Sequence, residues 1–194
     1  MLTGGDMKDC IAHAVVVILC AVGLAGLSAQ TQREADAYAA LFSLRFHGTA
    51  ASTMVVRDVA VRMPAVSGAS AEWLTQFDDV PAALRVSVSQ ASPTEARPLD
   101  AKLFPPGTML ISEQVISQLF AAGIEAGWSA FRQRYGSGLL SLSEILFTPD
   151  GLDALVYYEA HCGGLCGESA YLWLHRSATQ GHWSINRRIV RSMS

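Results

Sequence analysis

The stretch Cys162-Gly163-Gly164-Leu165-Cys166-Gly167 decides the fold, because strand-like runs flank it at Leu152 to Ala160 and at Ser169 to His175. Alternating runs with a glycine-rich stretch between them indicate a β-hairpin. The two cysteines then face each other across the turn. We predict that they form a disulfide that closes the tip of the hairpin.

Placing Cys162 opposite Cys166 fixes the register of the whole hairpin. Both faces are then apolar near the base of the hairpin and polar near its tip. We therefore expect helices to cover one face, and the N-terminal strand or a partner to cover part of the other. The expected pairs are Tyr158–Ala170 and Val156–Leu172 on one face, Tyr157–Tyr171 and Leu155–Trp173 on the other, and Glu159–Ser169 near the tip.

The last third of the chain contains four runs of this kind, separated by Pro149-Asp150-Gly151, by the cysteine turn and by residues 177–181. Runs that follow one another with turn residues between them are typical of antiparallel strands. We predict a C-terminal four-stranded antiparallel meander. Its strands are expected at Leu140–Phe147, Leu152–Ala160, Ser169–His175 and Trp183–Val190.

The residues before the meander show helical periodicity in several places. We predict an α+β fold in which three or four helices pack on the meander. The helices are expected at residues 34–46 and 80–90 and in the segments that begin at Ser112 and at Gly127, and a further strand is expected within Thr53–Met63.

The bulk composition limits the class of protein. The chain has 194 residues, of which 51% are hydrophobic and 16% charged, so it can form one domain with its own core. The formal net charge is −3 and the basic residues are scattered, so no continuous basic face can neutralise a phosphate backbone. We expect no nucleic-acid partner. We also expect no cofactor, since no helix follows the glycine turn to hold a phosphate.

The N-terminus has the pattern of an export segment. Lys8 precedes an apolar run at residues 11–27, which ends in Leu27-Ser28-Ala29-Gln30. A basic residue, an apolar run and small residues before a cleavage point are typical of a secretory signal peptide. We predict that residues 1–29 are this peptide and that residues 30–194 form a single α+β domain, in the periplasm or secreted.

An anchor is the alternative, because the run at residues 11–27 is long for a signal peptide and only slightly short of the about 20 residues that span a membrane. The protein would then contact the inner membrane through this segment alone.

Cleavage after Ala29 would remove Cys10 and Cys20 and leave one pair of cysteines, Cys162 and Cys166. Met7 directly precedes Lys8, so translation could start there rather than at Met1.

Two other interpretations of the cysteine pair remain open. A redox-active dithiol usually has two residues between its cysteines and lies at a helix N-terminus, whereas three residues separate these two and the setting is a strand turn. A metal site would add His161 and His175, but the register places both on the face opposite the sulfurs. We therefore predict a structural disulfide and no metal site.

Four residues are candidates for ligand binding: Trp73, Glu159, His161 and Glu168. The last three lie near the hairpin tip and carry the groups that acid–base catalysis uses. Trp73 lies in a loop-rich stretch, and an indole face packs well on apolar ligand surfaces. Charged side chains are also common at solvated turns, so we predict no catalytic residue and keep the four as binding candidates.

Several segments also suggest a family: Trp128-x-x-Phe131-x-x-x-Tyr135, Ala154-Leu155-Val156-Tyr157, the cysteine turn and Gly181-x-Trp183. This succession resembles a group of uncharacterised bacterial exported proteins that share a strand ending in A-L-V-Y, a glycine-rich turn and a G-x-W before the last strand. The resemblance covers roughly residues 128–190. It implies the fold and export, and it implies no activity, cofactor or catalytic residue.

These observations favour a non-catalytic binding or interaction domain of the cell envelope, whose partner is a small molecule, a glycan or a protein. One alternative is a cell-envelope enzyme that uses Glu159, His161 or Glu168. A second alternative is a thiol oxidoreductase that uses the cysteine pair.

Overall fold

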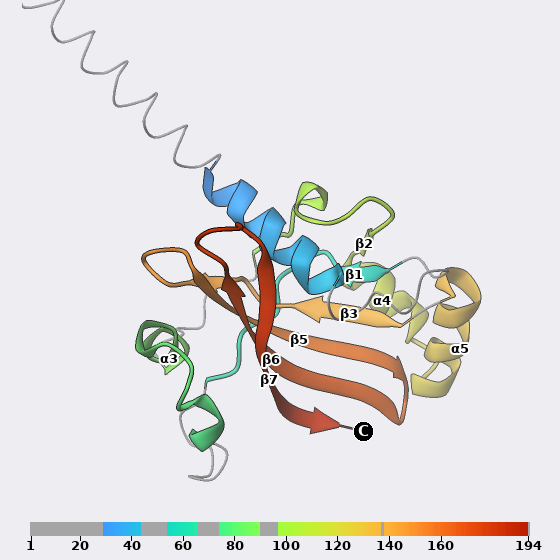
Figure 1. The fold of residues 1–194 in the computed structure, drawn as a ribbon. Coiled ribbons are helices and arrows are strands. Elements are labelled where there is room, and N and C mark those ends of the chain that lie inside the picture. Colours follow the sequence, from blue (N-terminus) through green and yellow to red (C-terminus); the bar gives the residue numbers. More distant parts are fainter. Residues whose placement is uncertain (1–28, 44–53, 66–73, 90–96, 137, 194) are drawn as a thin grey trace, which may run out of the picture.

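The computed structural model describes residues 29–43, 54–65, 74–89, 97–136 and 138–193 (Figure 1). The predicted export segment at residues 11–27 and the candidate Trp73 lie outside these residues. The described helices are the N-terminal helix at residues 29–43, α3 (Ala82–Ser89), α4 (Glu113–Leu119) and α5 (Ile124–Tyr135), with the 3-10 helices η1 (Thr75–Phe77) and η2 (Ala101–Leu103). The strands are β1 (Val55–Arg57), β2 (Met109–Ile111), β3 (Leu139–Leu142), β4 (Leu146–Phe147), β5 (Asp153–Gly163), β6 (Cys166–Arg176) and β7 (Trp183–Met193).

The described strands form one mixed sheet in the order β2-β1-β3-β5-β6-β7, with β4 also paired to β5. β1 is parallel to β2 and β3, and the other pairs are antiparallel. The α+β class is therefore confirmed. The four-stranded meander is not confirmed in that form, because two short upstream strands extend the sheet and the first expected strand, Leu140–Phe147, is divided into β3 and β4.

Ser143 accounts for that division. Its backbone N–H donates to the carbonyl of Tyr157 at 2.8 Å, while its own hydroxyl oxygen accepts the N–H of Tyr157 at 2.9 Å. A side-chain oxygen thus replaces a backbone carbonyl as the partner of β5. The regular ladder of β3 stops before this point, and β4 resumes the pairing nearer the base of β5.

The central hairpin agrees with the predicted register at the five pairs expected between Leu155 and Trp173, whereas Cys166 is opposite Gly163 and not opposite Cys162. Cys162 and Cys166 form a disulfide with a Cα–Cα distance of 5.1 Å, within the usual range for such bonds. The pairing shifts between His161 and Gly163, so an irregularity precedes the turn. The predicted disulfide-closed hairpin tip is therefore present.

Helices cover both faces of the sheet, whereas we expected them on one. The N-terminal helix packs Tyr38 and Leu41 on the face that carries Val156, Tyr158 and Leu172 (Figure 1). The opposite face carries two separate apolar clusters. One joins η1 and α3 to Tyr157, Tyr171 and Ile189, and the other joins α4 and α5 to Val55, Ile111 and Leu139.

The other predicted elements are present with different bounds. Ser112 caps α4 as expected, since its hydroxyl accepts the N–H of Val115 at 3.4 Å. α5 begins at Ile124 rather than Gly127, directly after Gly123, whose φ of +105° suits glycine. In the described part of Thr53–Met63, which begins at Met54, β1 is the strand that forms. The expected helix at residues 34–46 is described from residue 29 to residue 43.

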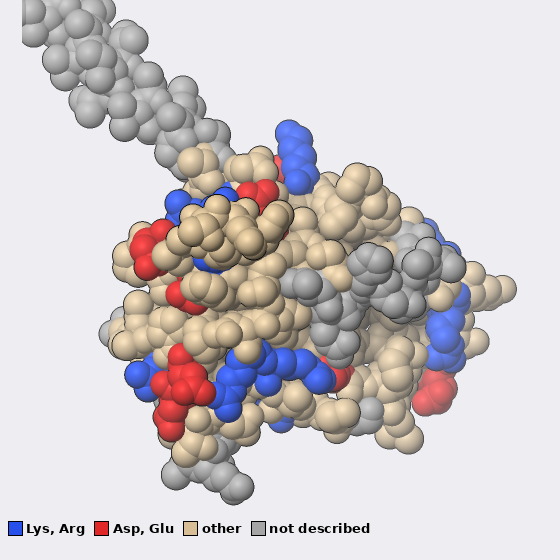
Figure 2. Space-filling model, in the orientation of Figure 1, with Lys and Arg blue, Asp and Glu red and all other residues tan. Residues whose placement is uncertain are grey.

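Acidic and basic side chains are interspersed on the face that Figure 2 shows. This pattern agrees with the scattered charges of the sequence. Within the residues that the structure describes, no helix has both the length and the apolar content that crossing a bilayer requires.

Candidate functional site on one face of the sheet

A row of polar side chains crosses five strands on the face that carries two apolar clusters. Ser141 is opposite Glu159, Glu159 is opposite Ser169, and Ser169 is opposite Ser192. Arg57 continues the row on β1, because Val56 is opposite Leu140 and Arg57 and Ser141 are the next residues. We call Arg57, Ser141, Glu159, Ser169 and Ser192 the polar row. It separates the cluster under α3 from the cluster under α4 and α5.

Glu159 lies at the centre of the polar row and has partners on its own strand. The hydroxyl of Tyr157 donates to its Oε1 at 2.8 Å, and Nε2 of His161 is 3.8 Å from its Oε2, an ion-pair distance rather than a hydrogen bond. His161 lowers the pKa of Glu159 most, and the Tyr157 hydroxyl and the charge of Arg57 also lower it, against a burial that raises it. The carboxylate is therefore held in its ionised form.

Tyr157 supports Glu159 as a fixed hydrogen-bond donor. The residue is 1% exposed, and burial is the main cause of its raised pKa, with hydrogen bonding to Ser169 and Arg191 acting in the other direction. A phenol with a raised pKa stays protonated at neutral pH. It can donate a hydrogen bond there but cannot act as a base.

Two polar atoms of the row have no hydrogen-bond partner among the described residues: the hydroxyl of Ser141 and Nε of Arg57. Ser141 is 1% exposed. Arg57 does form an ion pair through its Nη1 with Oε2 of Glu113 on α4, at 2.8 Å. A buried polar group without a partner costs about 1–3 kcal/mol, so this arrangement is not what stability alone would favour.

Glu168 lies apart from the polar row, on the opposite face. Its carboxylate bonds to the hydroxyl of Tyr158 and to Nη2 of Arg188, and Nε of Arg188 donates to the same hydroxyl at 3.3 Å. The reason is the period of two in a strand, because Glu168 is opposite Ala160 and not opposite Glu159. Of the three tip residues, the structure therefore brings only Glu159 and His161 together.

The disulfide lies at the exposed tip of the hairpin, beside α5. Nη1 of Arg132 on α5 donates to the carbonyl of Cys162 at 3.2 Å, which attaches the tip to that helix. His175 is at the other end of the hairpin, where its Nδ1 is 2.9 Å from Oδ1 of Asp153. Within the described residues, no group of three or more His, Cys, Asp or Glu side chains is placed to hold a metal ion.

A separate hollow of about 420 Å³ opens between η1 and α3, and it begins at Leu74, the residue after Trp73. It lies at the opposite end of the sheet from the hairpin tip and α5 (Figure 1). The sequence suggested Trp73 as a binding residue, but the helix face that lines the hollow was not among the candidates.

Sequence reasoning missed Arg57 and Ser141 as members of the polar row around Glu159. The hairpin register placed Tyr157 and Ser169 on the face of Glu159, and the expected meander placed the strand of Ser141 next to β5, but no sequence pattern showed that β1 pairs with β3. Comparisons with known protein families, with curated proteins and with solved structures find no match to this chain. The resemblance to exported bacterial proteins therefore stays a prediction.

Proposed function

We propose that the protein is a non-catalytic binding domain of the cell envelope, and that the polar row, with Tyr157 and His161, contacts a neutral polar ligand. The observation that carries this proposal is the environment of Glu159, a half-buried carboxylate whose position and ionisation are set by fixed neighbours. Such a carboxylate is a ready acceptor for the hydroxyl or amide groups of a ligand.

The direction of the pKa shifts favours binding over acid–base catalysis. A general acid or base works best when its pKa is near the working pH, so enzymes usually raise the pKa of a catalytic Glu. Here the pKa of Glu159 is lowered and that of Tyr157 is raised. Both shifts move the groups away from neutral pH, which weakens them as proton-transfer groups and leaves them as acceptor and donor.

The charges along the row favour a ligand without net charge. Arg57 is matched by Glu113, and the negative charge of Glu159 is balanced by the positive charge of Arg191, which bonds to Tyr157. Ser192 adds an exposed hydroxyl that can both donate and accept, and it is held in place by the hydroxyl of the buried Ser169 at 2.7 Å. An oligosaccharide offers the same mixture of donors and acceptors, so we take a neutral glycan as the ligand.

Location in the envelope rests on two observations that support each other. The sequence begins with the pattern of an export segment, and the disulfide at the hairpin tip is of a kind that persists in oxidising compartments. Alkaline phosphatase fused after Ala29 or at the C-terminus of the full chain would be active in the periplasm if this assignment is right.

Titration calorimetry with chitotriose, a neutral N-acetylated glycan, tests the ligand. We expect saturable binding that Glu159→Gln weakens at least tenfold, because the ionised acceptor is lost. Glu168→Gln is the matched control, since it removes a carboxylate from the opposite face of the same hairpin. Equal affinity for the three proteins, or no heat up to 10 mM glycan, would contradict the proposal.

The same samples separate the two alternatives. An enzyme that uses Glu159 and His161 would release shorter sugars, which NMR detects, and His161→Ala would stop that release. A thiol oxidoreductase would lose activity towards a dithiol substrate when both cysteines are replaced, while the glycan affinity would not change. The close pair of Glu159 and His161 is the only observation that favours the enzyme.

A further inference from the structure

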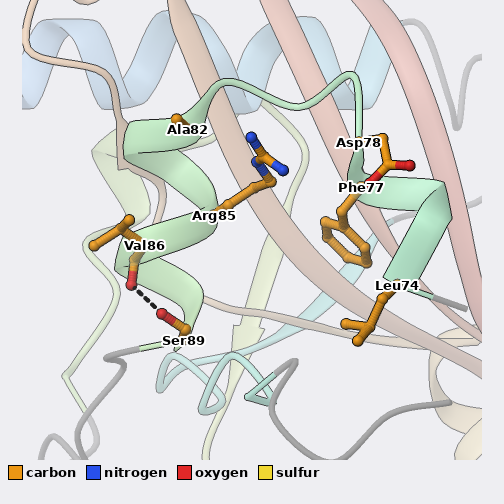
Figure 3. A pocket seen from close by; sticks show the side chains of 7 residues that line it. All are labelled: Leu74, Phe77, Asp78, Ala82, Arg85, Val86 and Ser89. Atoms are coloured by element: carbon orange, nitrogen blue, oxygen red, sulfur yellow. Dashed lines mark hydrogen bonds between the residues drawn. The ribbon is translucent and has the colours of Figure 1, made fainter. Parts of the chain in front are cut away.

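The hollow between η1 and α3 is lined by one face of a helix and one turn opposite it (Figure 3). α3 presents Ala82, Arg85, Val86 and Ser89, which occupy positions i, i+3, i+4 and i+7 and so share a face. Leu74, Phe77 and Asp78 line the other side. The opposite face of α3 carries Leu84 and Val88, which are fully buried and fix the helix on the sheet.

Apolar side chains dominate this lining and are left partly in water. Val86 is 49% exposed and Leu74 is 39% exposed, whereas the ring of Phe77 is buried and points into the hollow (Figure 3). A volume of about 420 Å³ falls within the range of small-molecule sites. The hollow therefore fits the apolar body of a small ligand and is a defined concavity rather than a flat face.

Among the described residues of the lining, Arg85 is the cationic one and Asp78, on the η1 side, is the acidic one. Its side chain extends over the hollow from α3 (Figure 3). No carboxylate within the described part of the chain is paired with it; Asp79, next to Asp78, is instead bonded to Arg187. A guanidinium is a strong partner for a carboxylate, with which it can form two parallel hydrogen bonds.

We infer that this hollow binds a small amphiphilic carboxylate of the medium-chain fatty-acid type. The acyl chain packs against Leu74, Phe77 and Val86, and the carboxylate pairs with Arg85. Arg85 has no carboxylate partner among the described residues, and this favours an acid over an alcohol of equal length. Asp78 also lines the hollow, so an amine of equal length is the competing ligand that the test has to compare. The hollow is separate from the polar row, so this inference can be tested independently of the glycan proposed there.

Calorimetry with octanoate, octanol and octylamine tests the inference on the purified full chain. We expect octanoate to bind saturably and at least tenfold more tightly than either octanol or octylamine. Arg85→Gln should bring octanoate to the affinity of octanol, and Arg85→Lys should retain most of the difference because it keeps the charge. Arg134→Gln, an exposed arginine on α5, is the control and should change nothing.

Three outcomes would overturn the inference. The first is equal affinity for octanoate and octanol, and the second is an octanoate affinity that Arg85→Gln leaves unchanged. The third is binding to anionic vesicles that depends on Arg85, because it would mean that this face binds a membrane surface. Thermal unfolding of each variant checks that the fold is intact. Glu159→Gln should keep its octanoate affinity, which separates a failure here from a failure of the polar row.

Discussion

Removing the disulfide is the most direct test of how the hairpin tip contributes to stability. The change is the double variant Cys162→Ser, Cys166→Ser. The bond joins residues separated by 4 positions, and the chain-entropy relation gives about 2 kcal/mol at 25 °C for a loop of that size. Both cysteines are exposed, so replacing the sulfurs removes little buried surface and creates no cavity. We therefore expect the loss to stay near this value.

The assay is urea unfolding followed by tryptophan fluorescence and by far-ultraviolet circular dichroism. With an m-value of about 2 kcal/mol/M, the midpoint should fall by about 1 M at unchanged slope. Dithiothreitol should move the wild-type midpoint to that of the variant and leave the variant itself unchanged. This comparison separates loss of the bond from any effect of the serines.

Two results would refute the reasoning. An unchanged midpoint would mean that the turn is as constrained without the bond as with it, so the loop-entropy argument would not apply. A loss above about 4 kcal/mol would mean that the bond supports more than a short turn. In that case the contact between the hairpin tip and α5 through Arg132 would also depend on the disulfide and would contribute to the stability of the fold.

Two further predictions concern the site and the packing. The pKa of Glu159 is lower in the folded state than its unfolded value of about 4.5, so its stabilising contribution is present above that value and is lost as pH falls through the folded pKa. The difference in unfolding free energy between wild type and Glu159→Gln should therefore disappear on acidification from pH 7 to pH 3. A difference that stays constant over this range would contradict the shift. Gly127→Ala should destabilise the protein by about 1–3 kcal/mol in the same urea assay, because the added Cβ would lie 2.4 Å from Cδ1 of the Phe120 ring. Ala126→Gly is the control, since it changes the neighbouring residue without this clash.

The hairpin could be predicted from the sequence because its information is local. Two cysteines at a short spacing fix one pair, and the period of two then fixes all the others. The same register already places Glu168 opposite Ala160, so grouping Glu168 with Glu159 by nearness in sequence conflicted with it. The prediction was wrong because it treated all the residues near the hairpin tip as one group, whereas successive residues of a strand lie on opposite faces of the sheet.

The polar row could not be predicted, because it depends on contacts between distant segments. β1 and β2 have three residues each, too few to show a period, and they join the sheet through parallel pairs with no turn to specify them. Arg57 and Ser141 look like ordinary strand residues until that pairing is known. The helical period predicts a helix at residues 80–90, where α3 lies, but no sequence pattern predicts η1 opposite it.

Besides stabilising the fold by about 2 kcal/mol, the disulfide fixes the register of β5 and β6. The polar row exists only while Ser141, Glu159 and Ser169 stay in register, since a slip of one residue would turn every side chain of a strand to the other face. The ladder is irregular between His161 and Gly163, immediately beside the row, so regular pairing is weakest there. The covalent bond lies just beyond this irregularity and fixes the alignment of β5 and β6 where hydrogen bonds alone specify it least.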